Sequence, residues 1–78
     1  MHAYVLITAD PGEMGHVATA TRKLKKVSAA TILGGPYDIL VDVRTTSFDD
    51  LSHVVARIHD IPGVARTVTC EGDPSIRI

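Results

Sequence analysis

The segment Gly34-Gly35-Pro36-Tyr37-Asp38 offers several groups that could bind a small ligand. Glycine supplies positive φ angles and Pro36 stiffens a turn, but a bare turn needs no aromatic ring and no carboxylate directly after it. Asp38 can receive an ammonium group, and the N–H groups of Gly34 and Gly35 are open to a carboxylate. Tyr37 would add an aromatic wall with one polar tip. The alternative is a structural turn in which Asp38 bonds local backbone N–H groups.

The other reactive side chains fit structural roles better. His53 and His59 are six residues apart, which places them on different sides of a helix, and no carboxylate pair joins them. We therefore expect no metal site. Cys70 has no basic neighbour in sequence, so we expect a partly buried thiol on a strand. Asp49 and Asp50 stand where a helix N-terminus favours acidic residues.

The charge balance limits the classes of partner. Eight basic and nine acidic residues give a net charge of −1, so direct nucleic-acid binding is not expected. The basic run from Arg22 to Lys26 is interpreted as a solvated face at the end of a helix. The longest apolar runs are too short to span a membrane, and the N-terminus does not match a signal peptide. We expect a cytoplasmic protein without a cofactor.

The chain length indicates one domain, residues 1–78, that needs a partner. Burial of apolar surface contributes about 110 kcal/mol at 25 cal/mol per Å². Ordering the chain at about 1.5 kcal/mol per residue costs nearly the same. One cysteine excludes an internal disulfide, and no Cys/His spacing supplies a structural zinc. A second copy of the chain is the remaining source of stability.

The hydrophobic pattern predicts six elements. Asp10 is expected to cap the first helix, with Pro11 in its first turn, and Ser47 to cap the second, which Ile61-Pro62-Gly63 ends. Strands are predicted at 1–9, 27–33, 37–45 and 64–70, and the first helix is predicted at 13–25. The core of the domain covers about residues 2–70, and residues 71–78 are expected to form a C-terminal tail.

This order of elements is the α+β ferredoxin-like βαββαβ arrangement, a four-stranded antiparallel sheet with both helices on one face. Whichever face of the sheet meets the helices, leucines, an isoleucine and a tyrosine remain on the other face, which indicates an interaction surface. Thr45 and Thr46, at the end of the third strand and the start of the second helix, are expected near the Gly34–Asp38 turn. They are weaker candidates for ligand contacts.

Three segments resemble the effector-binding (RAM) domain of Lrp/AsnC transcription regulators. Gly35-Pro36-Tyr37-Asp38 fits the family's G-x-[YF]-D turn, and Asp10-Pro11-Gly12 is similar to its first-strand exit. Ile61-Pro62-Gly63-Val64, followed by Arg66-Thr67-x-Thr69, resembles its second-helix exit and last strand. The resemblance covers about residues 2–70, and its specificity comes from the three segments occurring together at these spacings.

The resemblance implies a non-catalytic amino-acid-sensing module that couples ligand binding to assembly. Family members dimerise through sheet faces and associate further, so a homodimer is expected, with a tetramer or an octamer of dimers as larger forms. The effector would lie between dimers near the turn. The implied site consists of Gly34, Gly35, Pro36, Tyr37 and Asp38, with Thr45 and Thr46.

The family usually carries a winged helix-turn-helix before this domain, whereas here Met1 leads straight into the first strand. We therefore expect a stand-alone member that binds amino acids alone or joins a full-length Lrp/AsnC regulator.

Two other classes share this order of elements. Small dimeric ferredoxin-like enzymes need His, Asn, Arg or Trp side chains converging on one cavity, and this chain has no Trp and no Asn. ACT-like regulatory domains also bind amino acids. The turn that begins at Gly35 favours the Lrp/AsnC resemblance over an ACT-like domain.

Overall fold

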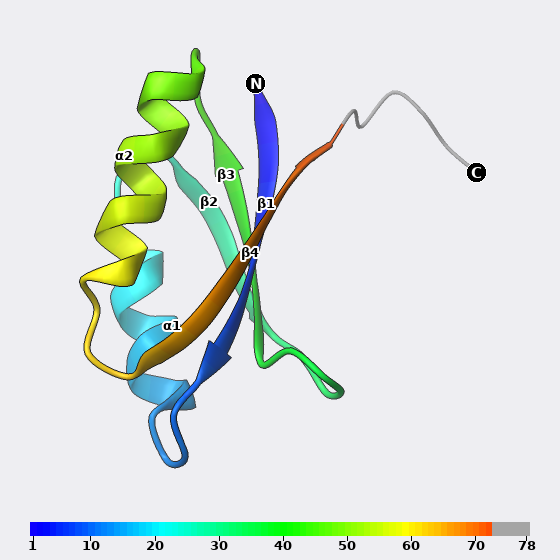
Figure 1. The fold of residues 1–78 in the computed structure, drawn as a ribbon, viewed down its shortest axis with the longest axis vertical. Helices are drawn as coiled ribbons and strands as arrows, with labels where there is room; N and C mark the ends of the chain where they lie inside the picture. The colour runs from blue at the N-terminus through cyan, green and yellow to red at the C-terminus, as the bar shows by residue number, and fades with distance from the viewer. Residues whose placement is uncertain (73–78) are drawn as a thin grey trace.

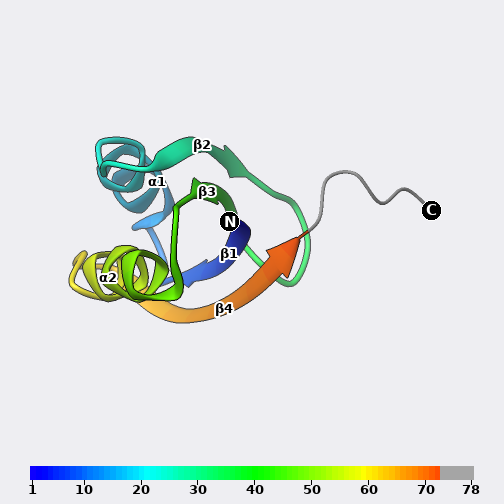
Figure 2. The same ribbon diagram turned by 90° about the horizontal axis from the view of Figure 1, so that it is seen from above.

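A computed structural model describes residues 1–72, and these form the six predicted elements (Figure 1). The strands form one antiparallel sheet in the order β2-β3-β1-β4, which is the expected ferredoxin-like topology. Both helices lie on the same side of this sheet (Figure 2). The elements are β1 His2–Ala9, α1 Met14–Arg22, β2 Val27–Ile32, β3 Ile39–Arg44, α2 Phe48–His59 and β4 Val64–Gly72.

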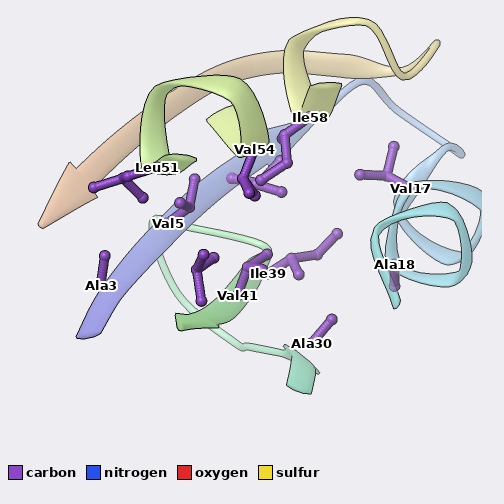
Figure 3. Close-up of a cluster of buried hydrophobic side chains, with 12 residues drawn as sticks. Ala3, Val5, Val17, Ala18, Ala30, Ile39, Val41, Leu51, Val54 and Ile58 are labelled. Carbon is purple, nitrogen blue, oxygen red and sulfur yellow. The ribbon is translucent and has the colours of Figure 1, made fainter. Parts of the chain in front are cut away.

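The core lies between the sheet and the two helices (Figure 3). Alternate residues of β1 and β3 point into it, as the pairing of Val5 with Val41 and of Ile7 with Ile39 shows. Each fully buried aliphatic side chain contributes about 1.5–3 kcal/mol relative to an exposed one. The core residues are Ala3, Val5, Ile7, Val17, Ala18, Ala30, Ile39, Val41, Val43, Leu51, Val54 and Ile58.

The first helix starts later than predicted. Asp10 is not its cap, because Glu13 occupies the N-cap position without a side-chain hydrogen bond. The Glu13 N–H instead donates to the Asp10 carbonyl at 3.0 Å, and Gly12 has φ +82°. Proline followed by a positive-φ glycine is the pattern of a type II turn, so this segment turns before the helix begins. The helix also ends at Arg22, three residues short of the predicted end.

The second helix begins as predicted. The Ser47 Oγ accepts a hydrogen bond from the Asp50 N–H at 3.2 Å, and Asp49 and Asp50 occupy the first turn. Both features stabilise the N-terminus of α2, where backbone N–H groups lack partners within the helix.

The last strand extends two residues beyond its predicted end. Glu71 and Gly72, assigned to the tail by the sequence, pair with Ala3 and His2 of β1. The rest of the predicted tail, residues 73–78, lies outside the described residues.

Gly63, at the entrance to β4, is required both for its backbone angle and for space. Its φ is +102°, and an added Cβ would lie 2.8 Å from the Cβ of Glu13. Its carbonyl accepts the Asp10 N–H at 2.7 Å, which ties the exits of α2 and β1 together.

We expect Gly63→Ala to lower the free energy of unfolding by about 2 kcal/mol, because backbone strain and steric overlap add. Gly12 has a similar φ with nothing near an added Cβ, so Gly12→Ala should cost only about 1 kcal/mol. Urea denaturation measures both. Equal losses in the two variants would contradict the steric argument.

Candidate functional site

The loop between β2 and β3 carries the Gly-Gly-Pro-Tyr-Asp segment at one end of the sheet (Figure 1). It is closed by the Leu33 N–H, which donates to the Asp38 carbonyl at 2.8 Å. Gly35 has φ +120° and open space around its α-carbon, so it serves the backbone conformation. Gly34, Gly35 and Pro36 are exposed, and Tyr37 is half-buried.

Asp38 fastens this loop to the end of β1. Its N–H donates to the Ile7 carbonyl at 2.9 Å, and its Oδ2 accepts the Ala9 N–H at 2.8 Å. The half-buried carboxylate therefore has a structural function, but its partner is 29 residues away rather than local. Within residues 1–72, Asp38 Oδ1 accepts no hydrogen bond. Oδ2 is thus held in place by the Ala9 N–H, and Oδ1 is available to accept a hydrogen bond from a ligand.

Thr45 and Thr46 do not lie near this loop, so that expectation is wrong for a single chain. They follow the last residue of β3, whereas Asp38 precedes the first, and six residues of strand span about 20 Å. The buried Thr45 donates from Oγ1 to the Ser47 carbonyl at 3.3 Å, and Thr46 donates to Asp50 Oδ2 at 3.0 Å. Both threonines serve the entrance to α2.

The face of the sheet opposite the helices, which we call the open face, has an apolar centre. Leu6 of β1 pairs with Leu40 of β3 on one side and with Val68 of β4 on the other. Leu6 and Leu40 are only half-buried, and Val68 is 39 % exposed. Three neighbouring strands thus present branched side chains at one level of the sheet without a covering layer among the described residues.

Polar and aromatic side chains pack at the other end of the open face. His2 Nε2 lies 2.7 Å from Asp42 Oδ1, and the His2 and Tyr4 ring centroids are 4.8 Å apart. The Tyr4 ring covers Gly72, where an added Cβ would lie 2.7 Å from the ring. This cluster was not predicted from the sequence. The shared parity of His2, Tyr4 and Asp42 on two neighbouring strands is the signal that could have revealed it.

Cys70 and the histidines add no metal-binding group. Cys70 is exposed on the edge strand β4, not partly buried as expected, because its pairing with Tyr4 places it on the open face, away from the helices. No three His, Cys, Asp or Glu side chains within the described part of the chain could jointly hold a metal ion.

Neither described helix is long and apolar enough to cross a membrane.

The strand order and the two helices define a ferredoxin-like domain with an open sheet face. More particularly, the chain belongs to the Lrp/AsnC ligand-binding domain family, whose model matches residues 2–70. The HTH-type transcriptional regulator FL11 of Pyrococcus horikoshii is 30 % identical over 69 residues, which are 88 % of this chain and 46 % of FL11. The chain thus spans about half the length of the curated relatives it matches.

Solved structures share the fold. The protein TTHA0845 from Thermus thermophilus aligns with a TM-score of 0.90 and 28 % identity, over 99 % of this chain and 98 % of that one. The transcriptional regulator NMB0573 from Neisseria meningitidis, solved as a complex with L-Met, aligns with a TM-score of 0.84 and 20 % identity. That alignment covers 99 % of this chain and 52 % of the regulator. These structures support the ferredoxin-like arrangement seen here.

Proposed function

We propose that this chain is a non-catalytic module that senses a small amino acid and couples its binding to the assembly of dimers. The observation that carries the proposal is the carboxylate of Asp38. Its Oδ2 is fixed by the Ala9 N–H, and its Oδ1 accepts no hydrogen bond within residues 1–72. A fixed carboxylate with one available oxygen is suited to an ammonium group.

The neighbouring loop supplies the rest of an amino-acid site. Gly34 and Gly35 are exposed and carry no side chains, so their N–H groups can approach a ligand carboxylate. The half-buried Tyr37 offers an aromatic surface for the ligand side chain. The structure of NMB0573 with L-Met makes amino acids the first class to test.

Dimerisation is proposed through the open face. Leu6, Leu40 and Val68 form a continuous apolar surface on three adjacent strands, and contiguous apolar surfaces of this kind mark interfaces. A second copy of the chain supplies the same surface, as a two-fold dimer requires. Solved regulators contain a domain of the same fold. We therefore propose that this chain also assembles with a full-length Lrp/AsnC regulator in the cytoplasm, and that this mixed assembly is how it affects transcription.

A thermal-shift screen of the whole chain against the standard amino acids tests the sensing function. Ligand present at one hundred times its Kd stabilises the folded state by about 2.7 kcal/mol, which raises the Tm of a domain this size by about 15 °C. We expect at least one amino acid to produce such a shift.

The controls are the matching amine without the carboxylate and the matching acid without the ammonium group. Neither should raise the Tm, because the proposed site needs both charges. If no amino acid raises the Tm, or if the amine alone does so equally, the proposed site is wrong.

A further inference from the structure

A cleft of about 420 Å³ lies between the end of α1 and the exposed side of α2, on the helix side of the molecule. This volume is in the range of pockets that hold small ligands. Leu24 and Val54 form its apolar part, and Lys23, Lys25, Lys26 and Arg57 surround it. The lysines come from the segment between α1 and β2, and Arg57 comes from α2, so the fold joins two separate basic segments.

The cleft concentrates positive charge in a chain whose net charge is −1. All three lysines of the sequence and one of its arginines line it, together with a single carboxylate, Asp50. The rest of the chain therefore has four basic and eight acidic residues. This separation of charge is invisible in the overall composition. The positive charge is concentrated at the cleft, and the rest of the chain is acidic.

One lysine is held in place by the fold. Lys26 has φ +72°, and no other non-glycine residue in the described chain has a positive φ. Its carbonyl accepts the Arg44 N–H at 2.9 Å, and its Nζ lies 2.5 Å from Asp50 Oδ2. The hydrogen bond from Lys26 is the main reason that the pKa of Asp50 is below its usual range. The unusual turn at Lys26 brings the lysine segment opposite α2.

The remaining cations of the cleft have no such partner. Lys23, Lys25 and Arg57 form no ion pair with a carboxylate among residues 1–72. Three unpaired positive charges around one cleft repel one another, and a bound anion relieves that repulsion. Phosphate groups satisfy several cations at once, since each presents multiple acceptor oxygens.

We propose that this cleft binds a small phosphorylated anion of the nucleoside di- or triphosphate class. The phosphates would contact Lys23, Lys25 and Arg57, and the uncharged part would cover Leu24 and Val54. Duplex DNA is a poorer match, because it needs basic residues along an extended surface, whereas acidic residues outnumber basic ones two to one outside the cleft. The cleft adjoins the start of β2, whereas the Gly34–Asp38 loop follows the end of β2. The proposed anion site and the proposed amino-acid site are therefore separate.

Calorimetric titration of the whole chain with ATP, pyrophosphate and adenosine, without divalent metal, tests the cleft. We expect ATP and pyrophosphate to bind, adenosine not to bind, and added NaCl to weaken both interactions. Arg57→Gln should weaken ATP binding about tenfold, the effect of losing one hydrogen bond between charged groups. Asp50→Asn should strengthen it by about two- to fivefold, because it removes the only carboxylate of the cleft.

Arg66→Gln is the matched control. It removes the same charge from an exposed position on β4, at the opposite edge of the sheet from β2, and should leave ATP affinity unchanged. The proposal is overturned if ATP and pyrophosphate do not bind, or if Arg57→Gln and Arg66→Gln have equal effects. Displacement of bound ATP by a short DNA duplex at lower concentration than by pyrophosphate would also overturn it, in favour of a nucleic-acid surface. Circular dichroism confirms that each variant is folded.

Discussion

Leu40→Glu is expected to dissociate the proposed homodimer. Leu40 is half-buried near the middle of the open face, paired with Leu6 on one side and with Thr31 on the other. A second sheet packed on this face would remove its side chain from water, and an unpaired carboxylate there costs about 3 kcal/mol or more. Two-fold symmetry places the new charge in the interface twice. We expect association to weaken by roughly a hundredfold or more, measured by sedimentation at several protein concentrations.

Phe48→Glu is the matched control for this experiment. Phe48 is 63 % exposed at the start of α2, on the helix side of the sheet, and glutamate there complements the helix dipole. This variant should sediment like the wild type. The proposed interface would be refuted by a Leu40→Glu protein that remains dimeric, or by a wild-type chain that sediments as a folded 8.3 kDa monomer.

The sheet and its two faces were predictable from the sequence because their signals are local and repetitive. The sequence divides β3 into two faces before any partner is known, with Ile39, Val41 and Val43 on one of them. The structure shows that this face is the buried one. The same holds for Val5 and Ile7 in β1. A shift of one residue would place every one of these side chains on the wrong face, so the pattern determines the pairing.

The ends of the elements were predicted less well, since several chemical roles compete there. Asp10 has the side chain of a helix cap, but the following Pro11 and Gly12 favour a type II turn, and the Asp10 N–H is used by the Gly63 carbonyl. That contact joins segments 53 residues apart in the chain. No local pattern reports such a contact.

The candidate site was predictable only where it depends on residues that are neighbours in the sequence. The residue types of the Gly34–Asp38 loop identify a turn with unusual chemistry, and the structure places them together. The bond from Ala9 to Asp38 depends on how the end of β1 meets the start of β3, which residue types do not encode. The basic cleft was missed because Arg57 and the lysine segment meet only through packing of α2 beside the α1–β2 connection.

The structural role of Asp38 determines how its proposed ligand role must be tested. Asp38→Ala would leave the Ala9 N–H without its partner, and such a loss costs about 1–3 kcal/mol of stability. Weaker ligand binding by that variant would not separate the two roles. Asparagine keeps an oxygen that can accept the Ala9 N–H, but it replaces the second carboxylate oxygen with a donor.

Asp38→Asn is therefore expected to remain folded and dimeric while losing affinity for the amino acid that gives the largest thermal shift. Removing one partner of a buried charged hydrogen bond costs about 2–5 kcal/mol, so binding should weaken at least thirtyfold, as measured by calorimetry. Asp49→Asn removes the same charge from an exposed position in the first turn of α2, and affinity should hardly change. If Asp38→Asn binds the amino acid as tightly as the wild type, Asp38 only fastens the loop to β1, and the ligand site lies elsewhere. Unfolding of the Asp38→Asn dimer would also contradict the proposal and show that the Asp38 carboxylate is needed for the fold. The proposed ligand role requires that the variant stays folded and binds the amino acid more weakly, because it lacks the carboxylate that pairs with the ligand's ammonium group.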